Sequence, residues 1–149
     1  MSPSPNASPS RGLLRHRLLP LVALAAISAA LWAAWLGWDQ HRDVHPDGST
    51  TGPYEAWQVI GLALTLLAPV CWAAARRQPA AAVGGTTAGL TVAAFYDWSD
   101  DVTGLFGVGV ALVTLGSLAL TALVTIVITA MKRDTPPAQN GSLLPSSGT

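Results

Sequence analysis

Four long runs without a charged residue divide this chain, and the charges between the runs are sorted by sign. The runs cover 18–38, 56–75, 78–96 and 102–131. Seven of the eight basic residues fall before the first run, between the second and third, or after the fourth, and seven of the eight acidic residues fall in the other two gaps. Because lysine and arginine near span ends stay on the cytoplasmic side of a membrane, the pattern predicts four spans with both termini in the cytoplasm.

The length of the runs and their continuous apolar character predict the fold class. A hydrocarbon core of about 30 Å is crossed by about 20 helical residues, and each run is close to that length or longer. Lipid admits only helices and closed barrels as spanning structures, and the strands of a barrel would alternate apolar and polar residues. We therefore predict an all-α polytopic protein, a bundle of four transmembrane helices. The last run exceeds one bilayer thickness, so its span is expected to begin near Phe106, and the predicted spans are 18–38, 56–75, 78–96 and 106–131.

The two ends of the chain have a different composition. Segments 1–17 and 132–149 are rich in Ser and Pro, apart from the basic residues next to the spans. Such segments bury too little apolar surface to offset the entropy of ordering. Both are predicted to be disordered cytoplasmic tails that flank a transmembrane domain over 18–131.

The first span has an alternative interpretation as a secretory signal. Arg11, Arg15 and Arg17 precede an apolar stretch that ends in the small residues 28–30, as in a signal with a cleavage site. The apolar run continues to Trp38, however, and exceeds the roughly 7 to 15 residues usual for a signal. An uncleaved span is the prediction.

Small and hydroxyl residues at a spacing of four indicate how the spans pack. Lipid gives helices no hydrophobic drive to associate, so close contact relies on side chains that let backbones approach. In the fourth span the hydroxyls align on one face, either bonding back to carbonyls of their own helix or forming a polar seam for a neighbouring helix or a water path. The stripes are Ala81, Gly85, Gly89 and Ala93 in span three, Ala25, Ala29, Ala33 and Gly37 in span one, and Ser117, Thr121, Thr125 and Thr129 in span four.

A proline and the aromatic residues mark particular depths. Pro69 removes a backbone hydrogen bond inside the second span, which predicts a kink near Thr65. The sequence Gly52, Pro53 and Glu55 predicts the start of that span, with glycine as N-cap and glutamate in the first turn. Amphipathic rings prefer the headgroup level, and the predicted interface anchors are Trp35, Trp38, Tyr54, Trp57, Trp72 and Trp98.

Several function classes are excluded by what the runs lack. Proton pumps and ion-coupled transporters usually keep ionisable residues inside the membrane, and none of the four runs contains one. Cys71 is the only cysteine, so neither a disulfide within the chain nor paired-thiol chemistry is available. A net formal charge of zero, with basic residues only beside the spans, argues against nucleic-acid binding. The sequence predicts no catalytic residue and no cofactor.

The first outer loop holds the only pattern of potential ligands. Acidic and imidazole side chains alternate there, and in an extended segment residues two apart project to one face. Such a set suits a divalent cation such as Zn²⁺ or Cu²⁺, although the same residue types are ordinary in hydrophilic loops. The candidate ligands are Asp39, His41, Asp43, His45 and Asp47.

The stretch 52–67, GPYEAWQVIGLALTLL, carries a resemblance together with Arg76, Arg77 and the later segment 97–100, DWSD. These features resemble uncharacterised small four-span integral membrane proteins of actinobacteria. The Ala-rich and Arg-rich composition is similar to that of proteins from such high-GC genomes. The resemblance implies an inner-membrane location and supplies no catalytic or ligand residues.

These observations lead to one expected function and two alternatives. We expect a small plasma-membrane protein that acts without catalysis as a structural or partner-binding component. Its expected partners are the lipid bilayer and either a second copy of the chain or another membrane protein. The alternatives are a permease or channel-like subunit that uses the hydroxyl face of span four, and an extracytoplasmic protein that binds or senses a divalent metal.

Overall fold

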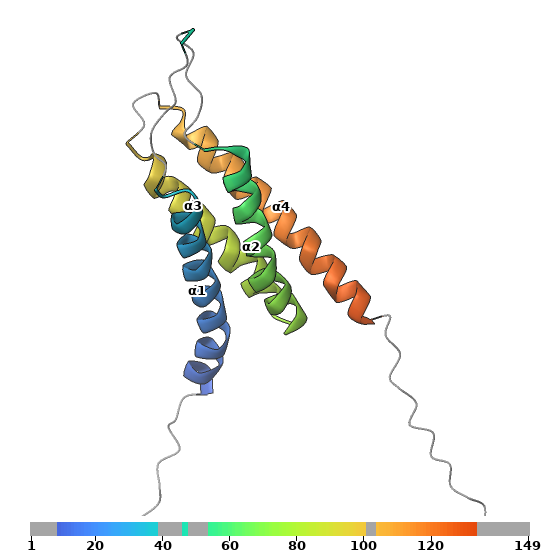
Figure 1. Ribbon diagram of the computed structural model, residues 1–149. Coiled ribbons are helices and arrows are strands. Elements are labelled where there is room, and N and C mark those ends of the chain that lie inside the picture. Colours follow the sequence, from blue (N-terminus) through green and yellow to red (C-terminus); the bar gives the residue numbers. More distant parts are fainter. Residues whose placement is uncertain (1–8, 39–45, 48–53, 101–103, 134–149) are drawn as a thin grey trace, which may run out of the picture.

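The structure, a computed structural model, describes residues 9–38, 46–47, 54–100 and 104–133 (Figure 1). Within these residues the fold is all-helical, with four α-helices and one π-helix. The helices are α1 (Pro9–Trp35), α2 (Ala56–Ala75), η1 (Ala81–Gly85), α3 (Thr86–Trp98) and α4 (Phe106–Arg133).

Consecutive α-helices run in opposite directions. The start of α1 and the ends of α2 and α4 lie at one end of the bundle, while the end of α1 and the start of α4 lie at the other (Figure 1). We call the first the basic end, because its charged side chains include Arg15, Arg17, Arg76, Arg77, Lys132 and Arg133. We call the second the acidic end, because it carries Glu55, Asp97 and Asp100, with Asp47 in the connection between α1 and α2.

Among the described residues, three helices are long and apolar enough to cross a membrane. They are Arg15–Trp35 within α1, the whole of α2, and α4. The prediction of four such helices differs at the third span, because the π-helix η1 divides it and leaves α3 with 13 residues. The helical backbone nevertheless continues from residue 79 to residue 98 across the π-turn.

Several predicted boundaries need correction. The helix α1 begins at Pro9, inside the tail that was predicted to be disordered, and α4 continues to Arg133. The N-cap of α2 is Glu55, so this residue precedes the first turn instead of lying in it. Its backbone N–H donates to the side-chain oxygen of Gln58 at 2.7 Å, which is one half of a capping box. Gly52 and Pro53 lie outside the described residues.

The closest helix contact joins α1 to η1 and α3 through glycine. A methyl group on Gly85 would lie 2.6 Å from the carbonyl oxygen of Leu21, and one on Gly89 would lie 2.3 Å from that of Ala25. Real side chains do not approach so closely, so only glycine permits this distance between the two backbones. Leu24 and Leu90 are buried beside the contact.

Two features stabilise the C-terminal end of α2, which lies at the basic end of the bundle. The N–H of Gln78 donates to the carbonyl of Ala73 at 3.0 Å and that of Arg77 to Ala74 at 3.1 Å, which is a Schellman motif. Arg77 takes the left-handed conformation, with φ of 58°, at the position where helices usually place glycine. From α4, the Lys132 ammonium donates to the carbonyl of Ala75 at 2.7 Å and so neutralises the negative end of the α2 dipole.

Candidate functional site

The densest polar contact of the described chain surrounds Asp97 at the acidic end. The indole N–H of Trp32 donates to Asp97 Oδ2 at 3.2 Å, and the hydroxyl of Tyr54 donates to the same oxygen. The indole N–H of Trp98 donates to the Tyr54 hydroxyl at 3.1 Å. These four residues, the Asp97 cluster, come from α1, the residue before the α2 N-cap, and α3.

The rings of the Asp97 cluster pack against one another. Trp32 meets Tyr54 edge-on at a centroid distance of 6.3 Å, and it meets Trp98 at 5.7 Å. Tyr54 and Trp98 lie 6.4 Å apart. All three distances are in the range of favourable aromatic pairs, and Trp32 itself is buried. The rings occupy the space beside the Asp97 carboxylate. The cluster therefore connects the helices to one another.

Another tryptophan of α1, Trp35, connects α1 to α2. The indole N–H of Trp35 donates to Thr65 Oγ1 at 3.1 Å, and Thr65 donates in turn to the carbonyl of Gly61 at 2.8 Å. A methyl group on Gly61 would lie 2.5 Å from the Trp35 ring, so glycine makes the room that the indole needs. Gly109 of α4 makes room for the half-buried Trp98, since a methyl group on Gly109 would lie 2.7 Å from the Trp98 ring.

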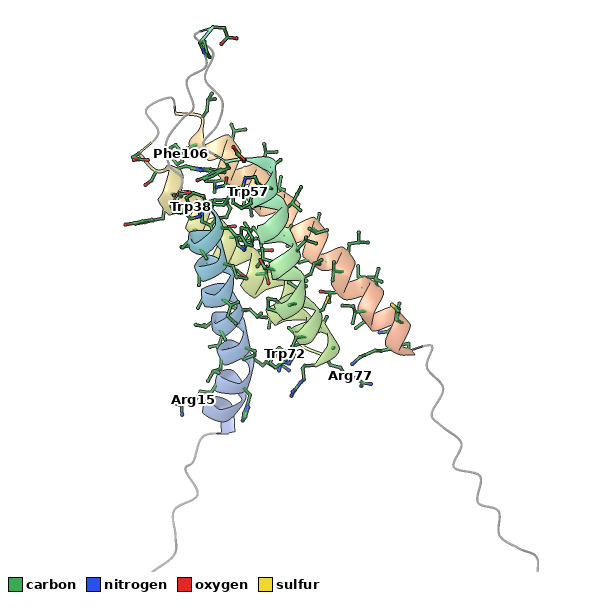
Figure 2. The ribbon with its side chains drawn as sticks, in the orientation of Figure 1. Arg15, Trp38, Trp57, Trp72, Arg77 and Phe106 are labelled. Atoms are coloured by element: carbon green, nitrogen blue, oxygen red, sulfur yellow. The ribbon has the colours of Figure 1, made fainter. Side chains whose placement is uncertain are left out.

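The predicted interface anchors therefore divide into two groups. Trp38, Trp57 and Trp72 are exposed, as expected of rings at the headgroup level. Trp35, Tyr54 and Trp98 are half-buried, and each forms a hydrogen bond to another segment of the bundle, which differs from the expectation of outward-facing anchors. Figure 2 shows Trp38 and Trp57 at the acidic end and Trp72 at the basic end.

The hydroxyls of α4 bond mainly to their own helix. Thr121 donates to the carbonyl of Ser117 at 2.6 Å, Ser117 donates to that of Thr114 at 3.1 Å, and Thr129 donates to that of Ile126 at 3.1 Å. Thr125 is buried, and its hydroxyl has no partner among the described residues. This geometry favours bonding within the helix over a continuous polar seam.

Thr114 of α4 does form a hydroxyl contact with another helix. Thr91 of α3 and Thr114 of α4 lie 2.9 Å apart at their oxygen atoms, and Thr114 also donates to the carbonyl of Val110. Neither threonine belongs to the stripes that the four-residue spacing singled out. In the predicted stripe of span three, Ala81 and Gly85 are buried, Gly89 touches α1, and Ala93 packs beside the core of Leu62 and Leu90.

A small apolar cavity lies between α2 and α4. Its volume is about 200 Å³, and its walls include Leu62 and Leu66 of α2 and Ser117 and Thr121 of α4. Thr86 at the start of α3 also lines it, and its hydroxyl is buried with no partner among the described residues. Drug-sized ligands need roughly 300 Å³ or more, so this cavity is small for a ligand site.

The remaining predicted site residues are placed as follows. The helix α2 continues without a break through Pro69. Of the candidate metal ligands, Asp39, His41, Asp43 and His45 lie outside the described residues, and Asp47 is exposed. Within the part of the chain that the structure describes, no group of three or more His, Cys, Asp or Glu side chains is arranged to hold a metal ion.

The Asp97 cluster was not singled out by the sequence. Trp32 and Asp97 are 65 residues apart, and no local spacing connects them. The available signal was that Asp97 and Trp98 follow an uncharged run directly, which places a carboxylate beside an indole at the edge of the span.

Comparison of the chain with protein-family models, with curated proteins and with solved structures finds no match.

Proposed function

We propose that this chain is a four-span integral protein of the plasma membrane, with both termini in the cytoplasm, and that it acts without catalysis as a structural or partner-binding component. In this proposal the stretch 79–98, helical across its π-turn, is the third of the four spans, in addition to α1, α2 and α4. The observation that carries the proposal is the separation of charge between the two ends of a helical bundle. The basic end faces the cytoplasm because basic residues near span ends are retained there.

The surface between the two ends supports a lipid environment. Large apolar side chains point outward along α2 and α4, where water would make their exposure costly. Lipid removes this cost and requires no partner for each side chain. Examples are Ile60 and Leu64 on α2 and Leu112, Leu123 and Ile126 on α4, all exposed by more than half.

The hydrogen bonds of the polar side chains support a structural role. The Asp97 cluster, the Trp35 bond to Thr65 and the pair of Thr91 and Thr114 all connect one helix to another. Lys132 connects α4 to the end of α2. Polar groups inside a bundle that bond across helices stabilise their arrangement.

Cysteine labelling tests the topology. In a Cys71→Ser background, Ser99→Cys places an exposed thiol at the acidic end and Ala80→Cys places one at the basic end. With a membrane-impermeant maleimide on intact cells, we expect Ser99→Cys to be labelled and Ala80→Cys to react only after lysis. Labelling of Ala80→Cys on intact cells, or protection of Ser99→Cys, contradicts the proposed orientation.

Co-purification tests the partner-binding role, and a solute-flux assay tests the alternative of a permease-like subunit. We expect the full chain to co-purify in a mild detergent with a second copy or with another membrane protein in a fixed ratio. We also expect proteoliposomes containing the chain to show no more solute flux than empty vesicles. Flux that is lost on Thr121→Val would contradict the proposal and favour a permease-like subunit.

A further inference from the structure

An open groove runs between α1 and α2 at the basic end. Its volume is about 860 Å³, within the range of roughly 300 to 1,000 Å³ usual for ligand sites. Its floor and walls are apolar and include Leu19, Ala23 and Ile27 from α1 and Trp72 from α2. Leu19 and Trp72 are exposed by 68% and 55%, so the groove opens to the outside of the bundle.

The mouth of the groove is polar and basic. Arg15 and His16 line it from α1, and Gln78 lines it after the end of α2. The guanidinium of Arg76 lies 5.0 Å from the centre of the Trp72 ring, which holds a second positive charge beside the α2 wall. Figure 2 shows Arg15 and Trp72 at the same end of the bundle.

No described acidic residue neutralises these charges. Asp47, Glu55, Asp97 and Asp100, the acidic residues in the described part of the chain, all belong to the acidic end or to the α1–α2 connection there. The groove therefore combines an apolar trench with a positive mouth.

We propose that this groove binds one anionic phospholipid of the cytoplasmic leaflet. The phosphate is held at the mouth by Arg15 and Arg76, and one acyl chain lies along Ala23 and Ile27. Basic sites between helices on the cytoplasmic side are suited to anionic headgroups because charge attraction acts together with burial of the chain. The inference rests on the proposed membrane location and orientation.

Native mass spectrometry of the full chain in a non-ionic detergent tests the site. The chain is mixed with equal amounts of phosphatidylglycerol and phosphatidylcholine that carry identical acyl chains. We expect one phosphatidylglycerol to be retained per chain in preference to phosphatidylcholine. Arg15→Gln is expected to weaken this retention about fivefold, the effect of one basic residue near an anionic surface. Equal retention of the two lipids would overturn the proposal.

Two matched controls separate this groove from general surface attraction. Arg17→Gln removes the same charge from the same helix, but Arg17 does not line the groove, so retention should be unchanged. Ala23→Leu fills the trench and should lower retention, whereas Ala26→Leu, on an exposed position outside the groove, should not. If Arg17→Gln weakens retention as much as Arg15→Gln, or Ala26→Leu as much as Ala23→Leu, the assigned site is wrong. Helical circular dichroism of each variant verifies that it is folded.

The lipid site and the membrane assignment fail in different ways. Alkaline carbonate extraction of the same cells reports whether the chain is integral to the membrane. If carbonate releases the chain, the proposed function fails and the lipid site fails with it. If the chain stays in the membrane and the purified protein shows no preference for phosphatidylglycerol, the lipid site alone is refuted.

Discussion

Asp97 accepts two of the side-chain hydrogen bonds that connect segments at the acidic end. Its Oδ2 atom accepts from Trp32 of α1 and from Tyr54 ahead of α2, so one carboxylate connects three segments. The hydrogen bonds of a charged acceptor stabilise more than those of a neutral one. A change of charge without a change of shape therefore tests how much the connection contributes.

We predict that Asp97→Asn lowers the stability of the bundle by about 1.5 to 3 kcal/mol, the usual contribution of a hydrogen bond to a charged group. The measurement is unfolding in mixed micelles with increasing SDS, followed by tryptophan fluorescence. Asp100→Asn is the control, because Asp100 is an exposed acid on the same end of the bundle. Equal loss of stability in the two variants would show that the Asp97 contacts contribute no more to the stability of the bundle than an exposed acid does.

At the scale of the helices, the arrangement depends on how closely α1 approaches η1 and α3. Gly84 and Gly85 are adjacent in sequence but have different surroundings. A methyl group on Gly85 would lie 2.6 Å from the Leu21 carbonyl oxygen, whereas one on Gly84 would meet nothing nearer than the Leu21 Cδ1 atom at 3.9 Å. The pair offers a matched test of helix contact.

We predict that Gly85→Ala destabilises the bundle by about 1 to 3 kcal/mol, the usual effect of overpacking a filled contact. Gly84→Ala should leave stability unchanged or raise it slightly, since alanine favours helical backbone over glycine. The same SDS titration measures both variants. A Gly84→Ala variant that is as unstable as Gly85→Ala would contradict the contact between the two backbones.

At the scale of the whole molecule, α1 packs as part of the bundle. Leu24, Ser28 and Trp32 are buried on one face of α1. Removing the part of α1 before Leu31 would uncover Gly85 and Gly89, the residues that pack against it.

We predict that the mature protein retains the segment before residue 31. Intact-mass measurement of the protein purified from membranes, with sequencing of its N-terminal peptide, checks this. A mature N-terminus at Leu31 would show that the first span is a cleaved signal. The buried contacts of Leu24 and Ser28 would then be absent from the working protein.

The sequence predicted the helices better than their contacts. Runs without charge, and the sorting of Lys and Arg against Asp and Glu, depend only on composition along the chain, and they predicted an all-helical fold with four helices. Local patterns located the ends less well. The predicted start of α2 placed Glu55 in the first turn of the helix. In the structure Glu55 is the N-cap, and its backbone N–H donates to the side chain of Gln58.

The site depended on tertiary structure for a physical reason. The α1 residues and their partners on α3 are far apart in sequence, so no spacing could pair Trp32 with Asp97 or Gly89 with Ala25. The four-residue stripe around Gly85 predicted close packing and left the partner open. What the sequence determined by itself was that the uncharged runs form helices and which ends of those helices carry which charge. Only the folded arrangement decided which indoles turn inward and which carbonyl meets which glycine, because those choices depend on distances between helices.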